Sequence, residues 1–262
     1  MAIEVHATTL QPWCVTTYLP NERETQILGG TESHSDAGNT LARTLRRHSA
    51  RLRLGWAIRF EGELRYPRAD GTTGVFYPDV LLALGLQLGP EDHFDIQERG
   101  GPPALVVEIT SKKTARKDVG PKRAAYAEMG VLEYVTFDPR TGKNLELHGY
   151  RLVGRRYVEI PPSPDGGLWL ETARLWFRAE PAQRPFGGPL LRLSTRDGQP
   201  LLHPQEESEA LDAAEEALDA AEQARDTAEQ ARDAAEEAHA ASLTEIARLR
   251  RLLSDRDPES TP

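Results

Sequence analysis

The chain has 262 residues, of which 39% are hydrophobic and 28% are charged, which indicates a soluble globular protein with room for one large domain and an appendage. No apolar run approaches the roughly 20 residues of a membrane helix, and the N-terminal segment lacks the pattern of a signal peptide. The single cysteine, Cys14, excludes an internal disulfide framework and a cysteine-based zinc site. We therefore expect a cytoplasmic protein.

The net charge of −9 is unevenly distributed along the chain. Residues 205–257 hold 16 acidic and 6 basic residues, whereas residues 1–204 hold 24 acidic and 26 basic residues. The acidity therefore belongs to the C-terminal tail, and the rest of the chain is close to neutral with clustered basic residues. This distribution does not argue against a nucleic-acid partner.

The first predicted element is a helix over residues 39–54, with leucines spaced so that they fall on one side. Five arginines lie largely off that apolar stripe: Arg43, Arg46, Arg47, Arg51 and Arg53. No acidic residue interrupts them. We therefore expect this helix to contact backbone phosphates without reading bases, with Arg46 and Arg47 as the candidate contacts.

Strand-like segments follow at residues 56–60, 75–84, 104–110 and 132–137. Between the last two, Pro121 suits the first turn of a short helix and Gly130 lies just past its end. A strand, a crossover helix and a second strand form a βαβ unit. The sequence therefore predicts an α/β domain over residues 1–180, with a mixed central sheet and flanking helices.

The predicted domain is followed by a proline-rich, irregular stretch. It contains a predicted strand over residues 168–177 and a hairpin around Asp197-Gly198. We interpret residues 181–204 as a β connector that contains this hairpin.

The tail repeats a seven-residue unit four times, as DAAEEAL, DAAEQAR, DTAEQAR and DAAEEAH. Alanine occupies both seam positions and favours helix, and larger apolar side chains from Leu243 to Leu253 would supply most of the association energy. We predict a coiled-coil helix over residues 205–257 that makes the protein a homodimer, with antiparallel pairing slightly favoured by charge, and a disordered end at 258–262. A solvated single helix is the alternative.

Two carboxylates occur in stretches that otherwise look like buried strands. Glu108 follows Leu105-Val106-Val107, and Asp79 lies in Val75-Phe76-Tyr77-Pro78-Asp79-Val80. An ionised carboxylate in such a place is costly unless it is paired or binds a metal. Two carboxylates with waters completing the shell suit Mg²⁺. The alternative is that strand alternation turns each carboxylate to solvent.

The segment after Glu108 is strongly basic, with six basic residues and one acidic residue over positions 110–123. Lys112 and Lys113 are candidates to hold a phosphodiester beside the carboxylates, although a solvated loop is the alternative. The four-residue spacing of Lys122 and Tyr126 places both on one helix face.

Together these segments resemble a known family. YPDV, PPALVVEITSKKT, the spaced Asp118, Lys122 and Tyr126, and MGVLEYVTFDP are similar to the Uma-type restriction endonucleases, which are placed in the PD-(D/E)XK nuclease superfamily. The resemblance covers about residues 25–160. It implies a restriction-endonuclease-like fold, DNA as the substrate, and Asp79 and Glu108 as the two acidic residues of the motif.

The chain departs from the superfamily pattern at the lysine that should follow Glu108 by two residues, because that position is Thr110. The resemblance implies that Lys122, in the following helix, replaces it, with Lys112 and Lys113 as weaker candidates. The predicted function is Mg²⁺-dependent hydrolysis of phosphodiester bonds, with Asp79, Glu108 and the Ile109 carbonyl as metal ligands. Two alternatives remain open: an inactive nucleic-acid-binding module with the same fold, and a protein whose coiled coil is the functional part.

Overall fold

The computed structural model describes residues 13–15, 32–85, 93–110, 118–139, 145–181 and 188–254. The chain consists of two compact units, Met1–Pro204 and Gln205–Pro262. Within the described ranges, no helix combines the length and the apolar character that crossing a membrane requires.

The first unit is built on a six-stranded sheet with the strand order β1-β4-β6-β7-β8-β9. Its strands are β1 (Ala57–Phe60), β4 (Val80–Ala83), β6 (Leu105–Ile109), β7 (Glu133–Asp138), β8 (Glu146–Val153) and β9 (Arg156–Glu159). The β6–β7 pair is parallel, and the other neighbouring strands are antiparallel. The crossover between β6 and β7 carries the helix α4 (Arg123–Met129). The predicted mixed α/β fold is therefore confirmed.

Two smaller sheets, of three strands each, complete the first unit. One has the order β3-β2-β5, and its strand β5 is followed by a single helical turn, α2. The other has the order β10-β11-β12. Their elements are β2 (Glu63–Pro67), β3 (Thr73–Phe76), β5 (His93–Asp95), α2 (Ile96–Arg99), β10 (Leu168–Leu170), β11 (Leu175–Glu180) and β12 (Leu190–Ser194).

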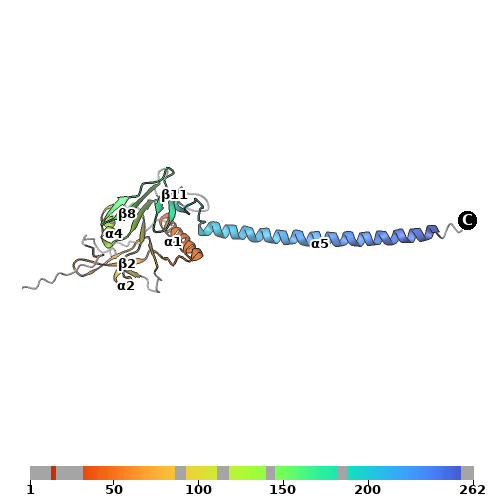
Figure 1. Cartoon of the computed structure of the whole chain (residues 1–262), viewed down its shortest axis with the longest axis horizontal. Coiled ribbons are helices and arrows are strands. Elements are labelled where there is room, and N and C mark those ends of the chain that lie inside the picture. The colour runs from red at the N-terminus through yellow and green to blue at the C-terminus, as the bar shows by residue number, and fades with distance from the viewer. Residues whose placement is uncertain are drawn as a thin grey trace, which may run out of the picture. The chain divides into compact units, whose positions relative to one another are not determined.

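Helices α1 (Glu32–Leu52) and α4 cover opposite faces of the main sheet (Figure 1). Leu41 of α1 belongs to the buried core that contains Ile109, whereas Tyr126 of α4 belongs to the core that contains Val106. Successive strand residues point to opposite faces. Glu108 therefore shares the α4 face with Val106.

The helix predicted over residues 39–54 is observed as α1, which spans Glu32–Leu52. It therefore begins before the predicted start and ends two residues before the predicted end. Its first turns come from the polar segment ESHSDAGN, which carries no apolar periodicity, although Ala37 is buried. At the other end, Arg53 adopts a left-handed backbone conformation with a φ of 53°, which terminates the helix.

The strand predicted over residues 75–84 is two strands in two different sheets, which corrects the prediction. β3 ends at Phe76 and pairs with β2, whereas β4 begins at Val80 and pairs with β1 and β6. Pro78 lies between them and has no N–H group to continue a ladder. The change of sheet places Asp79 immediately before β4.

The strand predicted over residues 168–177 is a hairpin of β10 and β11, joined by a turn at residues 171–174. β12 lies within the segment interpreted as a connector, where it pairs with β11 and contributes Leu191 and Leu193 to the core. Beyond β12, Gly198 has a φ of 85° and Ser194 pairs with Pro200, so the chain turns at Asp197-Gly198 as predicted.

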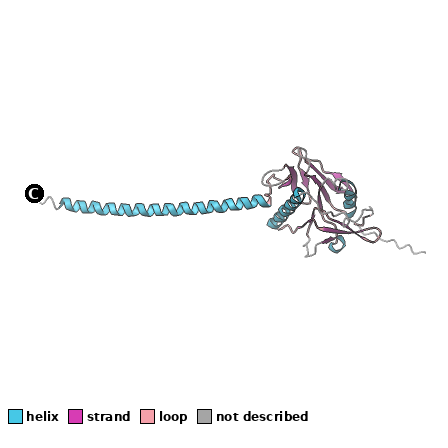
Figure 2. Ribbon diagram, turned by 180° about the vertical axis from the view of Figure 1, so that it is seen from behind, coloured by secondary structure: helices cyan, strands magenta, loops and turns pink. Residues whose placement is uncertain are grey.

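The second unit contains one long helix, α5 (Pro204–Ser254), shown as a single uninterrupted helix in Figure 2. The predicted helix over residues 205–257 is therefore observed to within a few residues. In the single chain its large apolar side chains are exposed, including those of Leu243, Ile246 and Leu249.

Candidate active site

Asp79 and Glu108 lie next to each other on the main sheet. Val80 pairs with Val107 in the antiparallel β4–β6 ladder, and Asp79 and Glu108 are the residues that adjoin this last pair, one on each chain segment. The Ile109 N–H group donates a hydrogen bond to Asp79 Oδ2 at 2.6 Å, which holds the aspartate against the end of β6.

Both carboxylates are buried, and Glu108 is held by two donors. Asp79 is 8% exposed and Glu108 is 3% exposed. Glu108 Oε1 accepts hydrogen bonds from Lys122 Nζ at 3.2 Å and from the Tyr126 hydroxyl at 2.7 Å. The pairing meets the requirement that a buried carboxylate have compensating partners.

The turn immediately before α4 carries Lys122, whose ammonium contacts Glu108. Asp118–Lys122 forms a wide π-helical turn, η2, that leads directly into α4. Pro121 lies within this turn, and its missing N–H group cannot join a regular helical ladder. Tyr126 then follows Lys122 by one helical turn, so both side chains reach the same carboxylate. Gly130, with a φ of 90°, ends α4 as predicted.

Thr110 occupies the position where the superfamily pattern has its lysine, and its backbone is committed to the sheet. Its N–H group donates to the Phe137 carbonyl at 2.7 Å, and the residue is 5% exposed. The cation beside Glu108 is therefore supplied by Lys122, from the helix rather than from the strand.

The structure does not bring every candidate residue to this site. Arg46 and Arg47 are on α1, which covers the opposite face of the sheet from Glu108. Arg46 Nε donates to the Ile58 carbonyl at 3.1 Å, and burial, assisted by the charge of Arg59, lowers the pKa of the Arg46 guanidinium. Lys112 and Lys113 lie outside the described residues.

The donor set fits a hard, oxygen-preferring divalent cation. Across the described ranges, no group of three or more His, Cys, Asp and Glu side chains is placed to hold a metal ion. Asp79 and Glu108 offer two carboxylates, and the Ile109 carbonyl is a further candidate oxygen donor. Such a set suits Mg²⁺, which keeps several of its water ligands.

A third buried carboxylate, Glu133, was not singled out from the sequence. It is 1% exposed and accepts hydrogen bonds from Arg151, from the Glu171 and Thr172 N–H groups and from the Thr172 hydroxyl. These donors lie on β8 and in the β10–β11 turn. Glu133 therefore joins the main sheet to the β10-β11-β12 sheet and has a structural role.

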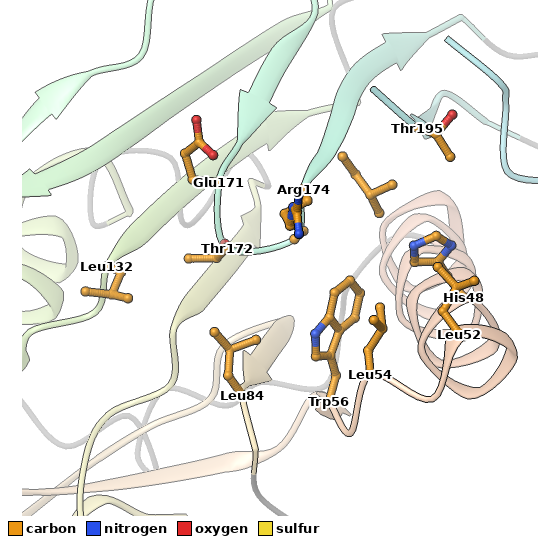
Figure 3. Close-up of a pocket in the computed structure, with 12 residues that line it drawn as sticks. His48, Leu52, Leu54, Trp56, Leu84, Leu132, Glu171, Thr172, Arg174 and Thr195 are labelled. Atoms are coloured by element: carbon orange, nitrogen blue, oxygen red, sulfur yellow. The ribbon is translucent and has the colours of Figure 1, made fainter. Parts of the chain in front are cut away.

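A separate groove of about 620 Å³ lies at the other end of the strands (Figure 3). Leu84, which follows β4, and Leu132, which precedes β7, line it together with Trp56 and the C-terminal part of α1. Asp79 precedes β4, so the groove and the carboxylates are at opposite ends of that strand. Of the described residues that line the groove, none is a predicted site residue.

The fold and the site define a mixed α/β protein with a buried aspartate, glutamate and lysine at one end of a parallel strand pair. The family model described as "Uma2: Putative restriction endonuclease" matches residues 17–178, and the chain belongs to this family. No curated protein gives a significant match. Among solved structures, the chain is similar to one described as a "putative nuclease belonging to DUF820" from Anabaena variabilis ATCC 29413, with 15% identity and a TM-score of 0.42, over 55% of this chain and 75% of that chain.

Proposed function

We propose that the first unit is a Mg²⁺-dependent endonuclease that hydrolyses phosphodiester bonds of DNA. The observation that carries the proposal is the contact between Lys122 Nζ and Glu108 Oε1 at 3.2 Å, beside Asp79. It supplies a lysine to the carboxylate pair although Thr110 stands at the usual position. Membership of a restriction endonuclease family supports DNA as the substrate.

The residues of the site divide the chemistry between them. Asp79, Glu108 and the Ile109 carbonyl would hold Mg²⁺, which when bound lowers the pKa of a coordinated water and polarises the phosphate. Lys122 would neutralise negative charge that develops on the phosphate or orient the attacking water. Lys112 and Lys113 remain candidates for phosphate contacts, and Arg46 and Arg47 are weaker ones because α1 covers the other face.

Incubation of the protein with supercoiled plasmid and with single-stranded DNA tests the proposal. We expect nicked or linear products in Mg²⁺ and none when EDTA removes the cation, because the proposed hydrolysis requires a divalent cation at the two carboxylates. Retarded DNA migration without cleavage, at any Mg²⁺ concentration, would instead support the inactive binding module, which Thr110 favours.

We also propose that α5 forms a homodimeric coiled coil and that the protein is cytoplasmic. The exposure of Leu243, Leu249 and Leu252, each more than half exposed, supports the coiled coil. The single cysteine, which permits no internal disulfide, is compatible with a reducing compartment.

Sedimentation velocity of the full chain should give the mass of a dimer, and a chain ending at Pro204 should sediment as a monomer. The reason is that several large apolar side chains, each worth about 1.5–3 kcal/mol when fully covered, lie in the last turns of α5. A Leu249→Glu, Leu252→Glu variant of the full chain is expected to dissociate, and an Ala213→Glu variant outside the seam is the control. Equal masses for the full and shortened chains would leave α5 as a single solvated helix.

A further inference from the structure

Two donors from successive turns of one helical segment converge on the same oxygen of Glu108. The Tyr126 hydroxyl is 2.7 Å from Oε1, and Lys122 Nζ is 3.2 Å from it. One donor is a neutral phenol and the other is a cation. The metal-dependent function proposed above uses Lys122 but assigns no task to Tyr126, which was noted in the sequence only for its spacing.

The position of the Tyr126 hydroxyl is set by packing. The side chain is fully buried, and its ring centroid lies 5.4 Å from that of Phe76 and 5.3 Å from that of Tyr134. A tyrosine ring turns about two side-chain bonds, and contacts with two neighbouring rings restrict both. Lys122 has a longer and more flexible stem. The phenol is therefore the more rigid of the two donors.

The two donors also respond differently to a divalent cation. An ion held between Asp79 and Glu108 adds positive charge close to the Lys122 ammonium, and like charges repel strongly in a site with little water. The neutral Tyr126 hydroxyl meets no such repulsion. The bond from Tyr126 to Glu108 is therefore compatible with a bound cation, whereas the bond from Lys122 competes with it.

We propose that Tyr126 is a positioning residue that holds the Glu108 carboxylate in the orientation required for cation binding, while Lys122 leaves Glu108 when the cation arrives. The inference rests on the proposed metal-dependent function and adds a division of tasks to it. Tyr126 retains the ligand, and the displaced ammonium becomes available to the phosphate. Outer hydrogen-bond partners of this kind typically change metal affinity by about 10–100-fold.

The division of tasks between Tyr126 and Lys122 can be tested by titrating the full-length protein with Mn²⁺ alone. Free Mn²⁺ is measured from its electron paramagnetic resonance signal. Tyr126→Phe keeps the ring and removes the hydroxyl, and we expect it to bind Mn²⁺ about 10-fold more weakly than the unaltered protein. Lys122→Met is expected to bind as tightly or more tightly, because a competing cation is gone. Tyr157→Phe is the matched control, since its hydroxyl donates to the Val131 carbonyl at 2.9 Å, away from Glu108.

Tryptophan fluorescence confirms that each variant is folded before its titration. Equal affinities for Tyr126→Phe and Tyr157→Phe would overturn the role of Tyr126, and weaker binding by Lys122→Met would overturn the competition. Absence of Mn²⁺ binding to the unaltered protein would overturn the proposed function itself, together with this inference. Failure of the proposed function therefore shows in the unaltered protein, whereas failure of this inference alone shows only in the comparison of the variants.

Discussion

Asp79→Asn is expected to reduce Mg²⁺-dependent DNA cleavage by about 10³-fold or more while the protein stays folded. The substitution removes an anionic metal ligand, and the charge stabilisation lost is several kcal/mol, which corresponds to a rate change of this size. An asparagine oxygen can still accept the hydrogen bond that the Ile109 N–H group donates to Asp79 at 2.6 Å. Initial cleavage rates on supercoiled plasmid, measured over a range of Mg²⁺ concentrations, provide the test.

The matched control is Asp70→Asn, in the exposed turn between β2 and β3, where the carboxylate accepts bonds from Thr72. It should cleave at the normal rate. Glu108→Gln is a less clean variant, because it removes the carboxylate charge that pairs with the buried ammonium of Lys122, and it should lose stability as well as activity. Undiminished Mg²⁺-dependent cleavage by Asp79→Asn would refute the assignment of the site.

Glu133→Gln is expected to destabilise the first unit by about 3 kcal/mol without any direct effect on the site. The carboxylate is 1% exposed, and the amide would place an N–H₂ group among donors from Arg151, Glu171 and Thr172. Breaking a buried charge-assisted network leaves such donors unsatisfied. Urea-induced unfolding should therefore show a lower midpoint with an unchanged slope.

Tryptophan fluorescence reports on the first unit alone in this experiment, because Trp13, Trp56, Trp169 and Trp176 all precede α5. The control is Glu159→Gln, which removes an exposed contact with His148 and should shift the midpoint little. Similar midpoints for the two variants would show that Glu133 does not hold the two sheets together.

The sequence was informative about the fold where the signals were local. The βαβ unit, the end of α4 at Gly130 and the long helix α5 each depend on nearby residues, and each was predicted. The division of residues 75–84 between β3 and β4 depends on pairing with distant strands, so an apolar run concealed it. The β10–β11 turn was missed because Arg174 adopts a φ of 52°, a conformation that glycine or asparagine usually signals.

The candidate site shows the same limit. Asp79 and Glu108 were identified as candidates because they are charged residues within apolar stretches of the sequence. Helical spacing placed Lys122 and Tyr126 on one face of a helix. The pairing of β4 with β6, which brings Asp79 to the end of the Glu108 strand, is a long-range property, as is the packing of α1 on the other face of the sheet. The arginines of α1 are exposed, as their spacing predicted. That spacing carries no information about which face of the sheet the helix covers.

The family match ends at residue 178, inside β11, but the folded unit extends further. β12 pairs with Trp176–Glu180 of β11 and places Leu190, Leu191 and Leu193 in the core covered by α1. A recombinant protein cut at the end of the match would present an unpaired strand edge beside an uncovered apolar surface, which promotes aggregation. The C-terminal boundary of a recombinant first unit, with any tag or fusion partner, should therefore be placed after residue 203 and not at residue 178, where the family match ends.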